Sequence, residues 1–193
     1  MAQPSPSDPR YQLESQIREC FGRCAYSHKT HEKMAEQLAG KQNRVKWYNI
    51  VISALVTGGA VGALFPTETR LFAYTTAALA VFSLVVNAYM KDIDPGALAQ
   101  RHREAASDLW NVRENYLSLL TDIGDEVFTI ENLRERRDGL QLELHQIYKG
   151  TPQTNGHAYG EAQDALKNKE DLTFSEKEID VMLPVSLRRD GRT

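Results

Sequence analysis

Two cysteines and two histidines lie close together near the start of the chain, and their types are those of zinc ligands. Cys20, Cys24, His28 and His31 follow the spacing Cys-x3-Cys-x3-His-x2-His. A structural zinc ion takes four ligands in a tetrahedral arrangement. Four side chains spread over more than about two and a half turns of one straight helix cannot surround an ion in that way. We therefore expect no metal here, and we expect the two cysteines to stay reduced and to pack between helices.

Catalytic sequence motifs are absent from the chain. It contains no glycine-rich phosphate loop, no Gly-x-Ser-x-Gly elbow and no His-Glu-x-x-His pair. His145 and His157 each stand apart from groups that could assist catalysis. We predict that the protein is not an enzyme, with no catalytic residue and no cofactor. The net charge of −3 offers no dense basic surface, so we do not expect DNA as a partner.

The two cysteines and His31 belong to a longer series of residues whose spacing alternates between four and three, as in helices that pack along a seam. The series is Leu13, Ile17, Cys20, Cys24, Ser27, His31, Met34 and Leu38. A second series with this spacing is Leu98, His102, Ala105, Leu109, Val112, Tyr116, Leu119 and Ile123. Asp8-Pro9 and Asp94-Pro95 each supply an N-cap and a first-turn proline, where a helix should begin. We expect the two helices to pack together as an antiparallel stalk.

Between these two helices, the chain has two long stretches without a charged residue. They are Trp47–Thr67 and Leu71–Met90, and only Glu68, Thr69 and Arg70 separate them. A bilayer core about 30 Å thick is crossed by roughly 20 apolar residues in a helix. So short a separation leaves room only for an antiparallel hairpin. The alternative, a hairpin buried in a soluble bundle, is disfavoured because the rest of the chain has too few apolar residues to cover two such helices.

Positively charged residues flank the hairpin on its open side. Lys41, Arg44 and Lys46 precede it and Lys91, Arg101 and Arg103 follow it, whereas the connection has Arg70 beside Glu68. Positive charge near membrane spans is retained in the cytoplasm. We therefore expect both termini of the chain to be cytoplasmic.

The predicted spans contain small and weakly polar residues but no charged ones, which removes the usual carriers of proton relay and voltage sensing. The residues that we single out for pore lining or helix packing are Asn49, Ser53, Thr57, Gly58, Gly62, Thr76, Ser83 and Asn87. Gly58-x3-Gly62 is a close-approach motif of membrane helices, and it can serve the two spans of one chain or a contact between chains. The polar side chains can line a water path in an oligomer or bond to the backbone in a monomer. The sequence leaves both choices open.

Together these features predict an all-α membrane protein. A two-span transmembrane helical hairpin would extend into an antiparallel cytoplasmic helical stalk, and short C-terminal helices would follow. We expect a disordered tail over 1–9, an N-terminal cytoplasmic helix over 10–46, the hairpin over 47–90 with spans 47–67 and 71–90, cytoplasmic helices over 94–150, and a loop with short helices over 151–193. Ser175 and Glu178 have the spacing of a capping box, so the last short helix should begin there.

A long N-terminal helix, a tight two-span hairpin and a second long helix resemble the SLATT-type two-transmembrane effector domains of bacterial conflict systems. The C-terminal segment adds to the resemblance through Tyr159, Ala162, Ala165-Leu166, the run Asp171-Leu172-Thr173-Phe174-Ser175-Glu176-Lys177-Glu178-Ile179-Asp180, and Leu183-Pro184. The resemblance implies a multi-pass protein of the bacterial inner membrane that acts in antiphage defence. Such an effector would form a pore or disrupt the membrane under control of a nucleotide second messenger.

The resemblance also implies a set of partners. They are the lipid bilayer, further copies of the chain in a homo-oligomer, a cyclic or linear oligonucleotide second messenger, and the nucleotide cyclase or polymerase that makes it. Because arginine binds phosphate through a planar fork, Arg101, Arg103 and Arg113 are candidate ligand contacts, with ordinary salt bridges as the alternative role. The competing function is a non-conducting membrane scaffold or adaptor that recruits a soluble partner.

Overall fold

The computed structural model describes residues 8–62, 69–125 and 127–189, and this part of the chain is helical with no strand. The elements are α1 (Pro9–Gly62), α2 (Thr69–Ile93), α3 (Pro95–Ile123), α4 (Ile130–Gly150), α5 (Gly156–Asn168), α6 (Glu176–Met182) and a 3-10 helix (Val185–Leu187). The fold class is therefore all-α, as predicted. Most of the tail expected over 1–9, the connection around Glu68 and the last residues 190–193 lie outside the described residues.

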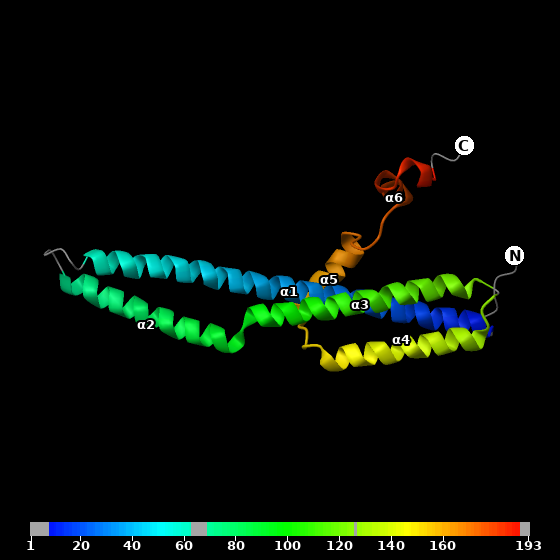
Figure 1. Ribbon diagram of the computed structural model, residues 1–193, viewed down its shortest axis with the longest axis horizontal. Coiled ribbons are helices and arrows are strands. Elements are labelled where there is room, and N and C mark those ends of the chain that lie inside the picture. Colours follow the sequence, from blue (N-terminus) through cyan, green and yellow to red (C-terminus); the bar gives the residue numbers. More distant parts are fainter. Residues whose placement is uncertain (1–7, 63–68, 126, 190–193) are drawn as a thin grey trace.

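The molecule is an elongated hairpin built along α1 (Figure 1). Helix α2 runs beside the C-terminal half of α1, and α3 continues beside its N-terminal half. Helix α4 turns back along α3, while α5 lies against α1 (Figure 1). The stalk, defined here as residues 9–46 of α1 together with α3 and α4, and the apolar hairpin, defined as residues 47–62 of α1 together with α2, therefore share one central helix.

Helix α1 is continuous from Pro9 to Gly62, a length of 54 residues. The sequence predicted a boundary between 46 and 47, and the helix passes through it without a break. No proline follows Pro9 within α1, so nothing in its interior removes a backbone donor. The first turn is capped by Asp8, whose carboxylate accepts a hydrogen bond of 2.9 Å from the Arg10 amide.

The chain that runs beside α1 is interrupted at Asp94, between α2 and α3. Asp94 is left-handed (φ 37°), a conformation that aspartate tolerates better than most residues, and its carboxylate accepts from the Ala97 amide at 3.0 Å. Pro95 follows at the first helical position, where its missing N–H costs nothing. A Cβ at Gly96 would collide with the side chain of Gln42, so this junction sits tightly against α1. The helix start predicted at Asp94-Pro95 is confirmed.

The core of the stalk lies between α1 and α3, with α4 closing one side. Its buried members are Leu13, Ile17, Cys20, Cys24, Val112, Tyr116, Leu119, Ile123 and Leu133. The predicted series on α3 is buried throughout except for Leu98, which is half-buried. On α1 the buried position is His28, whereas the sequence predicted Ser27. The next predicted positions, His31 and Met34, are buried, so the seam keeps its register, and His28 is buried beside it because its ring bonds to the Ala106 carbonyl of α3.

The ends of the shorter helices follow local sequence signals. Thr129 caps α4, and Asn155 caps α5, whose first helical residue is Gly156. Ser175 and Glu178 form the predicted capping box at α6. Arg10 joins the start of α1 to the far end of α3, because its guanidinium donates to the carbonyls of Ile123, at 2.9 Å, and Phe128.

Candidate functional site: an apolar hairpin on a stalk with polar layers

The apolar hairpin exposes the kind of side chains that the stalk buries. Large exposed residues on its two helices are Trp47, Tyr48, Ile50, Val51, Leu55, Val61, Leu71, Phe72, Tyr74, Val81, Phe82, Leu84, Val85 and Tyr89. Exposed apolar area is unfavourable in water by roughly 25 cal/mol per Å². A continuous apolar surface of this extent marks contact with a membrane or with other protein chains.

One described helical stretch, Arg70–Ile123, contains a window that is long and apolar enough to cross a membrane, and none of that window is buried. The window falls in the α2 part of the stretch, which is the predicted second span. The predicted first span has its described part in α1 up to Gly62, and its remaining residues 63–67 lie outside the described residues. The structure therefore identifies one candidate span and pairs it with an apolar helix of opposite direction.

An asparagine pair joins the two helices of the hairpin. The side-chain amide of Asn49 donates to Oδ1 of Asn87 at 2.6 Å, and the amide of Asn87 donates to Ser83 at 3.4 Å. The structure thus brings together three of the residues singled out in the sequence. Asn49 Oδ1 is buried without a hydrogen-bond partner among the described residues. In an apolar surrounding, an interhelical hydrogen bond of this kind fixes the register of two helices.

The close approach of the two helices occurs at a glycine that sequence reasoning did not select. A Cβ at Gly59 would collide with the hydroxyl of Thr76. At Gly58 a Cβ would meet nothing within 4 Å, and at Gly62 it would meet Cδ1 of Phe72 only at 4.0 Å. Gly59 continues the spacing of the stalk seam through Val45, Asn49, Ile52 and Val56, all half-buried. The sequence signal for this helix contact was the continuing alternation of four- and three-residue steps. The Gly58-x3-Gly62 motif drew attention to the wrong glycine.

The remaining small and polar residues of the first span point away from α2. Ser53, Thr57 and Gly58 are exposed. The Thr57 hydroxyl donates to the Ser53 carbonyl at 2.8 Å, so it is satisfied within its own helix. The predicted polar set therefore divides into an inner group at the helix pair (Asn49, Thr76, Ser83, Asn87) and an outer group on α1 (Ser53, Thr57, Gly58).

A buried layer of histidines crosses the stalk on the side of its core that is nearer the apolar hairpin. His31 of α1 and His102 of α3 share a hydrogen bond of 2.9 Å between their Nδ1 atoms. His28 Nδ1 bonds to the carbonyl of Ala106 at 2.8 Å. Burial, together with the rings of His102 and His28, lowers the pKa of His31 to about 4, and burial also lowers the pKa of His102. Both paired rings are therefore neutral at neutral pH.

The comparisons with known proteins identify the family. Residues 13–178 match the SMODS and SLOG-associating 2TM effector domain family 4, so the match includes the stalk, the apolar hairpin and the capping box. The chain belongs to this family. Neither a curated protein nor a solved structure matches the chain significantly. Membership makes this SLATT chain a membrane effector domain of the bacterial conflict class, which confirms the resemblance seen in the sequence.

The three arginines that the sequence offered as ligand contacts differ in their exposure in this SLATT domain. Arg113 is 8% exposed, with its guanidinium 4.9 Å from the Phe21 ring centre and 4.6 Å from that of Trp110, and it pairs with Glu114. Arg101 and Arg103 are exposed. Arg103 lines a groove of about 540 Å³ that also includes Trp110 and Leu172.

The four sulfur and nitrogen side chains considered as zinc ligands face different parts of the SLATT stalk. Cys20 and Cys24 are buried in the core beside Tyr116, while His28 and His31 face α3 one layer further along. Burial, with a contribution from Cys20, raises the pKa of Cys24 to about 11, so its thiol is protonated and unreactive at neutral pH. No group of metal-ligating side chains large enough for a metal site occurs in the described part of the chain.

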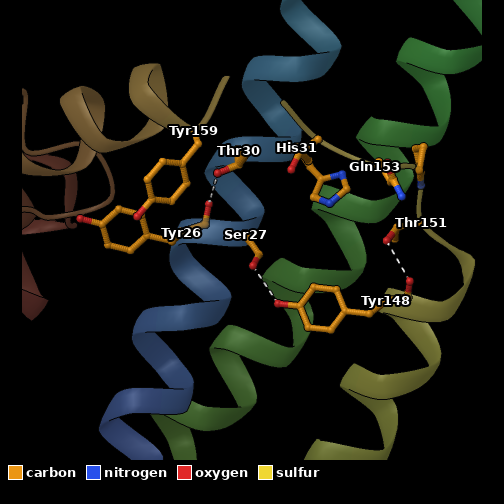
Figure 2. Close-up of a pocket in the computed structure, with 10 residues that line it drawn as sticks. Tyr26, Ser27, Thr30, His31, Tyr148, Thr151, Gln153 and Tyr159 are labelled. Carbon is orange, nitrogen blue, oxygen red and sulfur yellow. Dashed lines mark hydrogen bonds between the residues drawn. The ribbon is translucent and has the colours of Figure 1, made fainter. Parts of the chain in front are cut away.

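A pocket of about 420 Å³ opens beside the histidine layer (Figure 2). It is lined by Tyr26, Ser27, Thr30 and His31 of α1, Tyr148 of α4, residues 151–154 of the following loop, and Tyr159 of α5. The sequence analysis missed this pocket, because its residues meet only after α4 and α5 have packed on α1.

Proposed function

We propose that this SLATT protein is a membrane effector of antiphage defence whose hairpin crosses the bacterial inner membrane twice, with both termini in the cytoplasm. It oligomerises to form a pore or to disrupt the membrane, under control of a nucleotide second messenger made by a cyclase or polymerase partner. The observation that carries the proposal is the contrast along α1. Its N-terminal half buries apolar residues against α3, whereas its C-terminal half and α2 expose them.

The exposed surface supports two spans because both helices of the hairpin present it. A lone lipid-facing helix would leave residues 47–62 of α1, with Trp47 68% exposed and Leu55 56% exposed, facing water. Placing both helices in the bilayer removes these apolar side chains from water. The charged residues around Lys41–Lys46 and Lys91 then lie on one side, which supports cytoplasmic termini.

The outer group on α1 supports contacts between chains. Ser53, Thr57 and Gly58 face away from α2, so the hairpin itself does not use them. Small residues on a lipid-facing side allow close approach of a neighbouring helix, and weakly polar ones can line a water path once several copies surround it. In an oligomer, this outer group would contact a neighbouring chain or line the water path, whereas in a single chain it does neither.

Control by a ligand requires two arrangements of the stalk with different affinities for that ligand. Buried polar layers at His31–His102 and Arg113 support such an arrangement, because they weaken the seam relative to an apolar one and allow a modest binding energy to shift it.

The test is leakage from vesicles of bacterial phospholipid that contain the purified full-length protein and an entrapped dye. We expect release that depends on protein density and that changes when candidate cyclic and linear oligonucleotides are added. The variant to compare is Thr57→Leu with Gly58→Leu. It alters only the outer group, and we expect it to release less dye than the unaltered protein. Vesicles that stay tight under every condition would refute the effector function and leave the non-conducting adaptor.

A further inference from the structure

The pocket beside the histidine layer has the chemistry of a site for an uncharged aromatic group. Its ten lining residues include three tyrosines, one serine, three threonines and one glutamine, and none is Asp, Glu, Lys or Arg. A volume of about 420 Å³ falls within the range of small-molecule sites. A charged ligand would find no counter-charge on these walls, whereas a flat ring with hydrogen-bonding edges would find rings, hydroxyls and an amide.

Aromatic rings are available for stacking at the α5 side of the pocket. The rings of Tyr26 and Tyr159 lie 6.1 Å apart between centres and are inclined by 29° (Figure 2). Tyr159 is 50% exposed, so its ring can be covered by a ligand without displacing the core. Aromatic side chains of this kind are the usual platforms for nucleobases, because every base has a π-face.

The polar groups of the pocket are partly engaged and partly available. The hydroxyls of Ser27 and Tyr148 bond to each other at 2.7 Å, which ties α1 to the end of α4 (Figure 2). Within the part of the chain that the structure describes, the Gln153 side chain has no hydrogen-bond partner and is exposed at the pocket. A side-chain amide carries both donors and an acceptor, which matches the mixed edge of a nucleobase.

His31 connects the pocket to the opposite helix. It lines the pocket and also bonds through Nδ1 to Nδ1 of His102, which is fully buried on α3. In a bond between two neutral rings, one Nδ1 carries the proton and the other accepts it. A ligand that bonds to His31 Nε2 decides whether that atom carries a proton, and therefore which tautomer His102 must adopt. His102 Nε2 has no hydrogen-bond partner among the described residues, so a change of tautomer meets no competing bond.

We propose that this pocket binds a planar, uncharged heteroaromatic group of the nucleobase class and that His31 transmits its presence to α3 through His102. The role of this group as part of the controlling messenger rests on the proposed function, but its binding does not. The phosphates of such a ligand would lie outside the pocket, in solvent.

The test measures binding and transmission in one experiment. Full-length protein in detergent micelles, labelled with ¹⁵N in its histidine rings, is titrated with adenosine, guanosine, cytidine and uridine, and with ribose 5-phosphate as the probe that lacks a base. We expect at least one nucleoside to shift the ring signals of both His31 and His102 saturably, at concentrations up to about 10 mM. The signals of His145, which lies outside the pocket, serve as the internal reference.

Variants separate the pocket from general effects on the fold. Gln153→Ala and Tyr159→Ala should each weaken the nucleoside that binds by about tenfold. Their matched controls are Gln146→Ala, an exposed glutamine of α4, and Tyr11→Ala, a partly exposed tyrosine near the start of α1, neither of which lines the pocket. The controls should bind like the unaltered protein.

Three results would overturn the proposal. The first is that no nucleoside shifts the His31 ring signals at up to about 10 mM. The second is that ribose 5-phosphate shifts these signals as strongly as a nucleoside does. The third is that the control variants weaken binding as much as the pocket variants. A shift of His31 with unchanged His102 signals would refute the transmission. Dye release from vesicles made with the same protein is scored separately, so binding without release refutes only the effector function, and release without binding refutes only this pocket.

Discussion

The rings of His31 and His102 meet through their Nδ1 atoms at 2.9 Å, inside the seam between α1 and α3. This hydrogen bond exists only while at least one Nδ1 lacks a proton, so full protonation of both rings removes it and places two like charges in contact. The pair therefore makes the stability of the stalk sensitive to acid.

We predict that the unfolding temperature of the stalk falls as the pH decreases from about 6.5 to about 4. The pKa of His31 is lowered to about 4 in the folded chain, against 6.5 when unfolded, so in this window the unfolded state binds protons that the folded state does not. The stability that the neutral pair contributes is present above pH 6.5 and is lost as the pH falls. Circular dichroism during heating, at a series of pH values, measures it.

The carboxylates of the protein also titrate near the lower end of this window, so a variant must isolate the histidines. His31→Leu combined with His102→Leu should flatten the pH dependence between 6.5 and 5. His157→Asn, at an exposed histidine, should leave the dependence as it is. An equal slope in all three proteins would show that the buried pair does not contribute.

A second prediction compares two adjacent glycines of α1. Gly59→Leu should destabilise the hairpin by about 1–3 kcal/mol, because the side chain collides with Thr76 of α2. Gly58→Leu should leave the hairpin intact, because a Cβ there meets nothing within 4 Å among the described residues, and should reduce the oligomer. Thermal unfolding reports the first effect and chemical cross-linking in the membrane the second. Identical behaviour of the two variants would contradict the orientation of α1 in the hairpin.

The third prediction concerns the asparagine pair in the hairpin. Asn87→Leu should destabilise the hairpin by about 0.6–2 kcal/mol, because it leaves the Asn49 amide without its partner in an apolar surrounding. Adding Asn49→Leu should recover part of that loss, since neither helix then carries an unpaired amide. A double-mutant cycle of unfolding free energies in micelles measures the coupling. Additive losses would show that the hydrogen bond contributes nothing.

The fourth prediction assigns Arg113 to the structure of the stalk. Arg113→Ala should lower the free energy of unfolding by about 1–3 kcal/mol, because Phe21 and Trp110 both lose the guanidinium packed on their rings. Arg101→Ala, at an exposed arginine of the same helix, should change it by less than about 0.5 kcal/mol. Trp110 fluorescence follows the local change, and chemical denaturation gives the free energies. A negligible loss for Arg113→Ala would return it to the candidates for ligand binding.

The fifth prediction concerns the attachment of the C-terminal segment. Lys29 of α1 contacts Asp171 at 2.9 Å, and Asp171 is held between two left-handed residues, Glu170 and Leu172. Asp171→Asn should increase hydrogen exchange and protease cleavage around 169–173, because the ion pair is the charged link between this turn and α1. The control is Asp164→Asn, which removes an ion pair of 2.8 Å to Lys169 that does not involve α1. Equal protection in both variants would contradict this role for the pair.

The helices and the stalk seam could be predicted from the sequence because each depends on a local and repeated signal. Alternating steps of four and three placed Cys24, Tyr116 and Leu119 in the core, and the Ser175–Glu178 box marked the start of α6. The exchange of Ser27 for His28 shows the limit of that reasoning. Spacing alone does not reveal that the His28 ring bonds to the Ala106 carbonyl of α3, whereas the Ser27 hydroxyl bonds to Tyr148 of α4.

The pocket and the helix contact at Gly59 could not be predicted because they depend on how separate elements meet. Tyr26 and Tyr148 are 122 residues apart in number, and they reach one pocket only because α4 folds back along the stalk after α3 (Figure 1). Gly58 matched a familiar spacing, whereas the contact with Thr76 is decided by the rotation of α1 about its axis. Arg113 was offered as a ligand contact for a similar reason, since charge alone does not reveal that the rings of Phe21 and Trp110 pack on it.

The unbroken course of α1 has a mechanical consequence. At about 1.5 Å per residue, its 54 residues form a rod about 80 Å long. The other arm bends at Asp94, so only one arm of the hairpin has a joint. A displacement of α1 at the pocket is therefore carried along the rod into the hairpin, where the Asn49–Asn87 bond keeps α2 in register, and the joint at Asp94 takes up the change in angle between α2 and α3.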